Sequence, residues 1–157
     1  PNSNIDFDLS LAIKKSKENP VYYVQYAHAR ICSILANAEA KGGSLRKQVF
    51  DPEAQTRRGA SLSANYGLLT TDYELDLIKQ ITRLPELVED IATSFAVHRL
   101  TAYATGIADS FHRFYENCRV IGEEEDLMQA RLGLIMATKI AVANTLYLLG
   151  ISAPEKM

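Results

Sequence analysis

Apolar residues recur at three- and four-residue steps along most of the chain, which is the period of an amphipathic helix. The clearest run follows Asn19-Pro20, because asparagine caps helices well and proline is tolerated at the first helical position. We expect this helix to end at the glycine pair 42–43, which permits a left-handed helix end. Its buried face is expected to consist of Val24, Ala27, Ile31, Ile34, Leu35 and Ala38.

Three further helices are expected near the N-terminus and in the middle of the chain. Residues 7–17 have the spacing of a short amphipathic helix. Thr71 and Glu74 match a capping box. The helix that follows has Leu75, Ile78 and Ile81 at helical spacing. Pro85 begins another, whose expected inward positions are Leu87, Val88, Ile91, Ala92 and Phe95.

Two longer helices are expected toward the C-terminus. The first runs from about His98 to Cys118, and its apolar stripe consists of Leu100, Tyr103, Ala104, Ile107, Phe111, Tyr115 and Cys118. The second opens with the acidic run 123–126, which suits the positive end of the helix dipole. It is apolar almost all round as far as Gly150, with Ile140 among its core positions. Lys139 and Asn144 favour a central core helix over a membrane span.

Residues 44–70 lack this periodicity and favour at most a short helix near Arg46–Phe50. No segment alternates with period two for long enough to predict a strand. The sequence therefore predicts an all-α bundle of five or six helices that spans residues 5–157. Because Pro1 is not an initiator methionine, we expect residues 1–4 to be a cloning remnant or the end of a preceding domain.

Composition changes this picture little. Hydrophobic residues make up 47% and charged residues 23% of the chain, with a net charge of −2, as in soluble globular domains. Residues 1–60 carry nine basic against six acidic side chains, a bias too mild to prove a nucleic-acid contact. Cys32 and Cys118 lie far apart, so we expect two buried thiols, a reducing cytoplasmic location and no metal site.

The sequence has no recognisable catalytic constellation. It lacks a glycine-rich phosphate loop, a nucleophile elbow and a zinc-protease motif. His28, His98 and His112 have no paired nucleophile or carboxylate nearby in sequence, so we expect packed or surface residues. The run Lys14-Lys15-Ser16-Lys17 is expected to be a solvated helix face. We therefore expect no catalytic residue and no cofactor in this chain.

Tyrosines outnumber phenylalanines, eight to five, and three of them cluster on the helix after Asn19. Tyr23, Tyr26 and Arg30 lie at positions i, i+3 and i+7, on one stripe. Aromatic rings and a guanidinium suit the unpaired bases of a single-stranded RNA loop. Alternatively, the tyrosines cover a helix–helix seam with their hydroxyls at the rim, and the pattern by itself favours this second interpretation.

Three stretches resemble arginyl-tRNA synthetases in order and spacing. They are NPVYYVQYAHARIC at 19–32, FHRFYENCRV at 111–120, and the ending from Ala130-Arg131-Leu132 to Met157. Nearly the whole chain is similar to the C-terminal anticodon-binding domain of that family, the DALR domain, a helical bundle of class I synthetases. The literal Asp-Ala-Leu-Arg string is absent, and the nearest stretch is Gln129-Ala130-Arg131-Leu132.

The resemblance implies that Tyr23, Tyr26 and Arg30 contact the anticodon loop of arginine tRNA, where a middle cytosine is recognised. It also implies that Tyr115 stacks on loop bases and that the carboxylate of Met157 approaches the anticodon. Attachment of arginine, with ATP and Mg, would belong to a catalytic domain outside this chain, so this chain alone would be inactive.

The expected partners are the anticodon loop of arginine tRNA and the protein's own catalytic domain, docked around Phe7, Leu11 and Tyr22. We expect a cytoplasmic monomer that binds neither DNA nor a membrane. Two alternatives stay open at this point. The chain could be a helical protein-interaction module, or the anticodon-binding domain of another class I synthetase.

Overall fold

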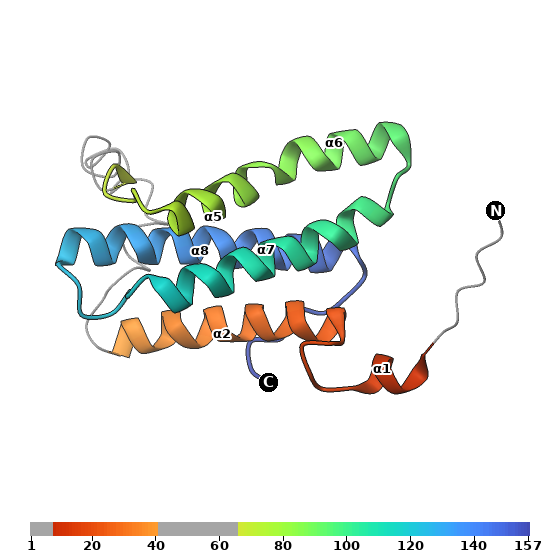
Figure 1. Cartoon of the computed structure of the whole chain (residues 1–157), viewed down its shortest axis with the longest axis horizontal. Coiled ribbons are helices and arrows are strands. Elements are labelled where there is room, and N and C mark those ends of the chain that lie inside the picture. The colour runs from red at the N-terminus through yellow and green to blue at the C-terminus, as the bar shows by residue number, and fades with distance from the viewer. Residues whose placement is uncertain (1–7, 41–65) are drawn as a thin grey trace.

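The computed structural model describes residues 8–40 and 66–157, apart from the side chain of Ala12. Within these ranges the chain forms six helices and no strand, as Figure 1 shows. They are α1 (Leu9–Ile13), α2 (Pro20–Ala40), α5 (Asp72–Thr82), α6 (Leu84–Ser94), α7 (His98–Asn117) and α8 (Glu125–Leu148). The all-α prediction is confirmed. The expected helix end at 42–43 and the helix near Arg46–Phe50 lie outside the described residues.

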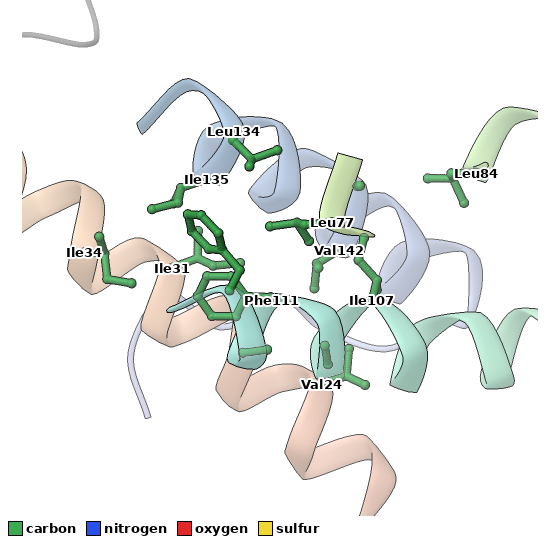
Figure 2. Close-up of a cluster of buried hydrophobic side chains, with 14 of the residues drawn as sticks. Val24, Ile31, Ile34, Leu77, Leu84, Ile107, Phe111, Leu134, Ile135 and Val142 are labelled. Atoms are coloured by element: carbon green, nitrogen blue, oxygen red, sulfur yellow. The ribbon is translucent and has the colours of Figure 1, made fainter. Parts of the chain in front are cut away.

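Helix α8 is the central element of the bundle. It contacts α2, α5 and α7, while α2 also contacts α7 and α5 also contacts α7. Helix α6 follows α5 and packs against α7, and α1 lies beyond the N-terminal end of α2 (Figure 1). Side chains from α2, α5, α7 and α8 meet in one core (Figure 2), which includes Val24, Ile31, Leu77, Ile107, Phe111, Ile135 and Val142.

The predicted start and buried face of α2 are confirmed. The side-chain oxygen of Asn19 accepts hydrogen bonds from the backbone N–H groups of Val21 (3.1 Å) and Tyr22 (3.4 Å). This satisfies two of the donors that a helix N-terminus leaves unpaired. The six apolar residues expected to face inward are all buried.

A buried ion pair between α5 and α8 was not predicted. Glu74 completes the predicted capping box with Thr71, and its second carboxylate oxygen accepts from Arg131 Nε at 2.7 Å. The side chains of Glu74 and Arg131 are 0% and 9% exposed. Burial by itself would raise the pKa of Glu74, but the hydrogen bonds from Thr71 and Arg131 outweigh it and lower that pKa below its ordinary value.

The helix expected over 7–17 is much shorter than predicted. Helix α1 starts after Asp8, whose carboxylate accepts from the N–H groups of Ser10 and Leu11, and it ends at Ile13. Lys14 is already in extended backbone conformation, and the Asn19 side chain donates to its carbonyl at 3.1 Å. The lysine run therefore lies in the connection between α1 and α2, and the prediction that it forms a helix face is wrong.

Two inward positions predicted for α6, Ala92 and Phe95, are wrong, and the apolar spacing noted on α5 does not mark its buried face. Leu75 is 40% exposed, whereas Leu77 is fully buried against the core. Ala92 is exposed, and Phe95 is 84% exposed at the left-handed end of α6, with φ of 57°. The reason is that the outer part of α6 has no further helix to pack against in the described bundle, so an apolar periodicity there has nothing to bury it.

The two C-terminal helices follow their predictions more closely. The α7 stripe is buried from Leu100 to Cys118, with Tyr115 half-buried at its edge. On α8, Ile140 is exposed rather than in the core, because it lies on a face that α2, α5 and α7, the described helices packed against α8, leave uncovered. Cys118 is buried as expected, whereas Cys32 is only half-buried. Among the described helices, none is both long enough and apolar enough to span a membrane.

Candidate nucleic-acid interface

An open groove of about 430 Å³ lies between α2 and α7. Helical spacing on α2 directs Tyr22, Tyr26 and Arg30 to one side of the helix, with Tyr23 beside them. His112 and Glu116, one turn apart on α7, form the other wall, and Lys17 closes the end beside the α1–α2 connection. Two helices far apart in the sequence therefore build one concave surface of aromatic and charged side chains.

The aromatic rings of the groove form a continuous surface. The rings of Tyr22 and Tyr26 lie nearly parallel, with an interplanar angle of 9° and centroids 6.4 Å apart. The ring of Tyr26 stacks on His112 at 5.9 Å, and Tyr23 is tilted against His112 at 5.1 Å. Since Tyr26 is 40% exposed, part of its ring is open to a ligand. Flat, accessible rings of this kind can stack on nucleic-acid bases.

Arg30 links the groove to the second predicted tyrosine. Its guanidinium carbon lies 4.6 Å from the ring centroid of Tyr115 and 6.0 Å from that of Tyr26. These are cation–π distances. Its Nη1 also donates to the hydroxyl of Tyr26 at 3.3 Å. A guanidinium has five N–H donors, so this arrangement orients Arg30 and leaves donors available for a base edge or a phosphate.

Tyr23 differs from its neighbours because its hydroxyl is already engaged. It donates to the carboxylate of Asp109 on α7 at 2.7 Å. Burial, followed by this hydrogen bond, raises the pKa of Tyr23 well above its ordinary value. Tyr23 thus fastens α2 to α7, which matches the helix-seam interpretation, whereas Tyr22 and Tyr26 present open ring surface.

Among the groove residues that the sequence did not predict as site residues, which are Lys17, Tyr22, His112 and Glu116, His112 makes the most ring contacts. Its ring contacts Tyr23, Tyr26 and Phe111, and its Nε2 is buried with no hydrogen-bond partner in the described part of the chain. Burial, and then the positive charge of Arg30, lower the pKa of His112, so the ring is neutral at neutral pH. One signal was available, since His112 lies within the second stretch that resembles the synthetases, three residues before Tyr115.

Of the predicted site residues, Tyr115 and Met157 do not line the groove itself; Tyr115 lies beside it under Arg30, whereas no contact joins Met157 to the other site residues in the described part of the chain. The side chain of Met157 is 56% exposed. The preceding residues lie along α2, where Gln25 Nε2 donates to the Ser152 carbonyl at 2.9 Å and His28 Nδ1 lies 2.8 Å from the Pro154 carbonyl. The structure therefore brings four of the five predicted residues together: Tyr23, Tyr26, Arg30 and Tyr115.

Potential metal ligands do not gather anywhere in residues 8–40 and 66–157. No group of three or more His, Cys, Asp or Glu side chains is close enough there to hold an ion. The chemistry that the groove offers is ring stacking, hydrogen-bond donation by Arg30 and hydrogen-bond acceptance by Glu116.

Comparison with known proteins gives a consistent picture. A family model described as the DALR anticodon binding domain matches residues 24–157. The chain is 46% identical over 155 residues to an arginine–tRNA ligase of Dehalococcoides mccartyi, covering 99% of this chain and 25% of that protein. It is also 46% identical over 156 residues to an arginine–tRNA ligase of Moorella thermoacetica, covering 99% of this chain and 26% of the relative. The chain therefore spans about a quarter of the length of the curated relatives that it matches.

Solved structures agree with the family match. The arginyl-tRNA synthetase of Thermus thermophilus superposes with a TM-score of 0.71 at 30% identity, over 100% of this chain and 24% of that one. The enzyme of Plasmodium falciparum superposes with a TM-score of 0.68 at 28% identity, over 99% of this chain and 24% of that one. Because the family model covers most of the described bundle, including the groove from Tyr26 to Glu116, this chain belongs to the DALR anticodon binding domain family.

Proposed function

We propose that this chain is the part of an arginine–tRNA ligase that recognises the anticodon loop of arginine tRNA. The observation that supports the proposal most directly is the groove in which Tyr22, Tyr26, Arg30 and His112 present ring faces and a guanidinium together. The relatives named above are arginine–tRNA ligases, and the chain belongs to a family described as anticodon-binding.

The groove suits an RNA loop for a physical reason. Bases that leave the helical stack need new stacking partners, and an aromatic side chain supplies roughly 1–3 kcal/mol per base. Tyr26 is the most accessible platform, and Tyr115 with Arg30 over its ring is a second. Cytosine has an amino donor beside a ring-nitrogen acceptor, so an acceptor such as Glu116 and a donor such as Arg30 can contact its edge together.

The remaining parts of the proposal concern the whole protein. The ligation of arginine to tRNA, with ATP and Mg, takes place in a catalytic domain beyond this chain, and the isolated chain is inactive. That assignment is supported by the relatives, which are about four times as long as this chain. The protein acts as a monomer in the cytoplasm, and the carboxylate of Met157 approaches the bound anticodon.

An apolar depression supports contact with the protein's own catalytic domain. It measures about 260 Å³ and lies between the start of α2, the first half of α7 and the end of α8; its lining includes Val21, Val24, Leu146 and Leu149. Val21, which lines it, is 44% exposed. Of the docking residues expected from sequence, Leu11 is exposed, Tyr22 lines the RNA groove instead, and Phe7 lies outside the described residues.

Binding of the 157-residue chain to arginine tRNA tests the proposal. We expect tighter binding to this tRNA than to the same tRNA with its middle anticodon base changed, measured by fluorescence anisotropy at fixed, moderate salt. Tyr26→Ala should weaken the cognate complex by about 5- to 150-fold, which corresponds to the loss of one stacking platform. Tyr147→Ala is the matched control, because Tyr147 is an exposed tyrosine on α8 outside the groove.

The alternatives predict different outcomes. Preference for a different anticodon would indicate another class I synthetase, and no tRNA binding at high micromolar protein would indicate a protein-interaction module. If Tyr26→Ala lowers only the melting temperature and leaves binding unchanged, the tyrosines act as a helix seam and the groove is not the site.

A further inference from the structure

The connection between α1 and α2 is held together by several hydrogen bonds of its own. The backbone N–H of Asn19 donates to the Ser16 carbonyl at 3.0 Å, and the Asn19 side chain donates to the Lys14 carbonyl at 3.1 Å. The N–H of Glu18 donates to the Ser16 hydroxyl at 3.3 Å. Since Asn19 itself is buried and also caps α2, the connection is held in one position relative to the groove.

The lysines of this connection differ in their surroundings. Lys14 forms an ion pair with Glu18, so its charge is compensated. Lys15 and Lys17 are both exposed, and neither has an ion-pair partner within the described residues. Lys17 lines the groove beside Tyr22 and Tyr26. A compensated lysine and two uncompensated ones thus lie within four residues of each other.

No carboxylate of the described residues forms an ion pair with Lys17, although the neighbouring Glu18 interacts with its charge at longer range. Asp109 accepts a hydrogen bond from Tyr23, and Glu18 is paired with Lys14. Glu116 lines the opposite wall on α7, and Arg30 lies over the rings of Tyr26 and Tyr115. The groove therefore has positive charge at Lys17 and at Arg30 and one negative charge at Glu116, and the accessible rings of Tyr22 and Tyr26 lie on α2 between the two cations. Binding sites for single-stranded nucleic acid combine these two features, since cations follow the backbone while rings stack on bases.

We propose that the α1–α2 connection is the phosphate-binding edge of this groove, where Lys17, assisted by Lys15, contacts the sugar–phosphate backbone of the RNA whose bases stack on Tyr22 and Tyr26. This inference rests on the proposed function and adds a second kind of contact to it. Stacking and base-edge contacts select the sequence, whereas these lysines add affinity that is independent of sequence. Preordering by Asn19 lowers the entropy cost of the contact, because the backbone that carries Lys17 is already fixed.

The salt dependence of RNA binding separates this role from base recognition. Each phosphate contact by a cation on single-stranded nucleic acid contributes about 0.7 to the slope of log K against log salt. Lys17→Ala should therefore reduce the slope by about 0.7, and the double variant Lys15→Ala/Lys17→Ala by about 1.4. At 0.1 M salt the single variant should bind about 5-fold more weakly than the original chain, and the two should converge near 1 M.

The experiment uses an RNA hairpin whose loop carries an arginine anticodon, and a second hairpin with the middle base replaced. Lys79→Ala is the matched control, since Lys79 is an exposed lysine on α5, which does not contribute to the groove. Circular dichroism confirms that each variant is folded. We expect Lys17→Ala to lower affinity for both hairpins by the same factor, with the ratio between them and the Lys79→Ala slope unchanged.

Two results would overturn the inference while leaving the proposed function intact: an unchanged slope in Lys17→Ala, or a loss of affinity confined to the cognate hairpin, which would make Lys17 a base contact. If the original chain binds both hairpins equally but the slope still depends on Lys17, the proposed recognition of the anticodon fails and the phosphate edge stands. If it binds neither hairpin, both fail.

Discussion

The buried Glu74–Arg131 pair makes a quantitative prediction for stability. Replacing Arg131 by methionine keeps most of its volume but leaves the Glu74 carboxylate inside the protein without its cation. Removing one partner of a buried pair costs about 3–5 kcal/mol. Arg131 also donates to the Arg119 carbonyl, so the variant loses that hydrogen bond as well. For a domain of this size, such a loss corresponds to a decrease in Tm of about 6–20 °C.

A surface pair provides the control for this variant. Arg113 and Asp76 are 3.2 Å apart, but their side chains are 60% and 42% exposed. Solvent screens such a pair, so Arg113→Met should cost at most about 1 kcal/mol. Urea denaturation followed by circular dichroism gives the free energy of unfolding for both variants. Equal losses in the two variants would contradict the reasoning, because they would mean that burial of the Glu74 charge has no special cost.

The pH dependence adds a second signature. The folded-state pKa of Glu74 is lowered, so its contribution to stability is present above the unfolded pKa, near 4.5, and is lost as pH falls through the folded pKa. Without Arg131, protonation relieves an uncompensated buried charge. The stability difference between the original chain and Arg131→Met should therefore shrink between pH 7 and pH 4. The double variant Glu74→Gln/Arg131→Met, which buries no charge and keeps a capping side chain, should recover much of the loss. A pH-independent difference would refute this account.

Two further predictions concern His112, which lines the groove, and Phe95, which is exposed where the sequence predicted burial. The folded-state pKa of His112 is lowered, so its contribution to stability is full above the unfolded pKa of about 6.5 and is lost as pH falls below it. His112→Phe should therefore lose less stability than the original chain between pH 7.5 and 5.5, measured by urea denaturation. Equal shifts of the urea midpoint with pH in the two proteins would contradict this. Phe95→Asn should raise the free energy of unfolding by up to about 1 kcal/mol, because asparagine tolerates a φ of 57° better than phenylalanine and little burial is lost. Thermal or urea denaturation measures this change. A clear destabilisation would show that Phe95 makes stabilising contacts.

The parts of the fold that were predictable have strong local causes. The start of α2 depends on Asn19 and Pro20, and the start of α5 on the capping box of Thr71 and Glu74; both signals act within four residues. The inward faces of α2 and α7 were also predictable, since these helices have neighbours along their length and a 3.6-residue period then corresponds to burial.

The errors arise where burial depends on a distant partner. Phe95 continues the apolar period of α6, yet the helix ends there in a left-handed turn beyond the packed part of the bundle. Lys17 belongs to a charged run that fits a helix surface equally well, and only the hydrogen bonds of Asn19 place it in an ordered connection beside the groove. In both cases the local pattern was compatible with two structures, and the tertiary neighbours decided between them.

The sequence alone determined that the chain is helical, and it placed Tyr23, Tyr26 and Arg30 on one stripe of one helix, because a helical period needs only local geometry. Its resemblance to arginyl-tRNA synthetases indicated which family that stripe belongs to. The tertiary structure decided what each tyrosine does. Packing of α7 against α2 occupies the Tyr23 hydroxyl with Asp109, leaves Tyr26 open, and adds His112 and Glu116 to the groove from more than eighty residues away. No local pattern contains that pairing, because it arises only when two separate apolar stripes bury each other.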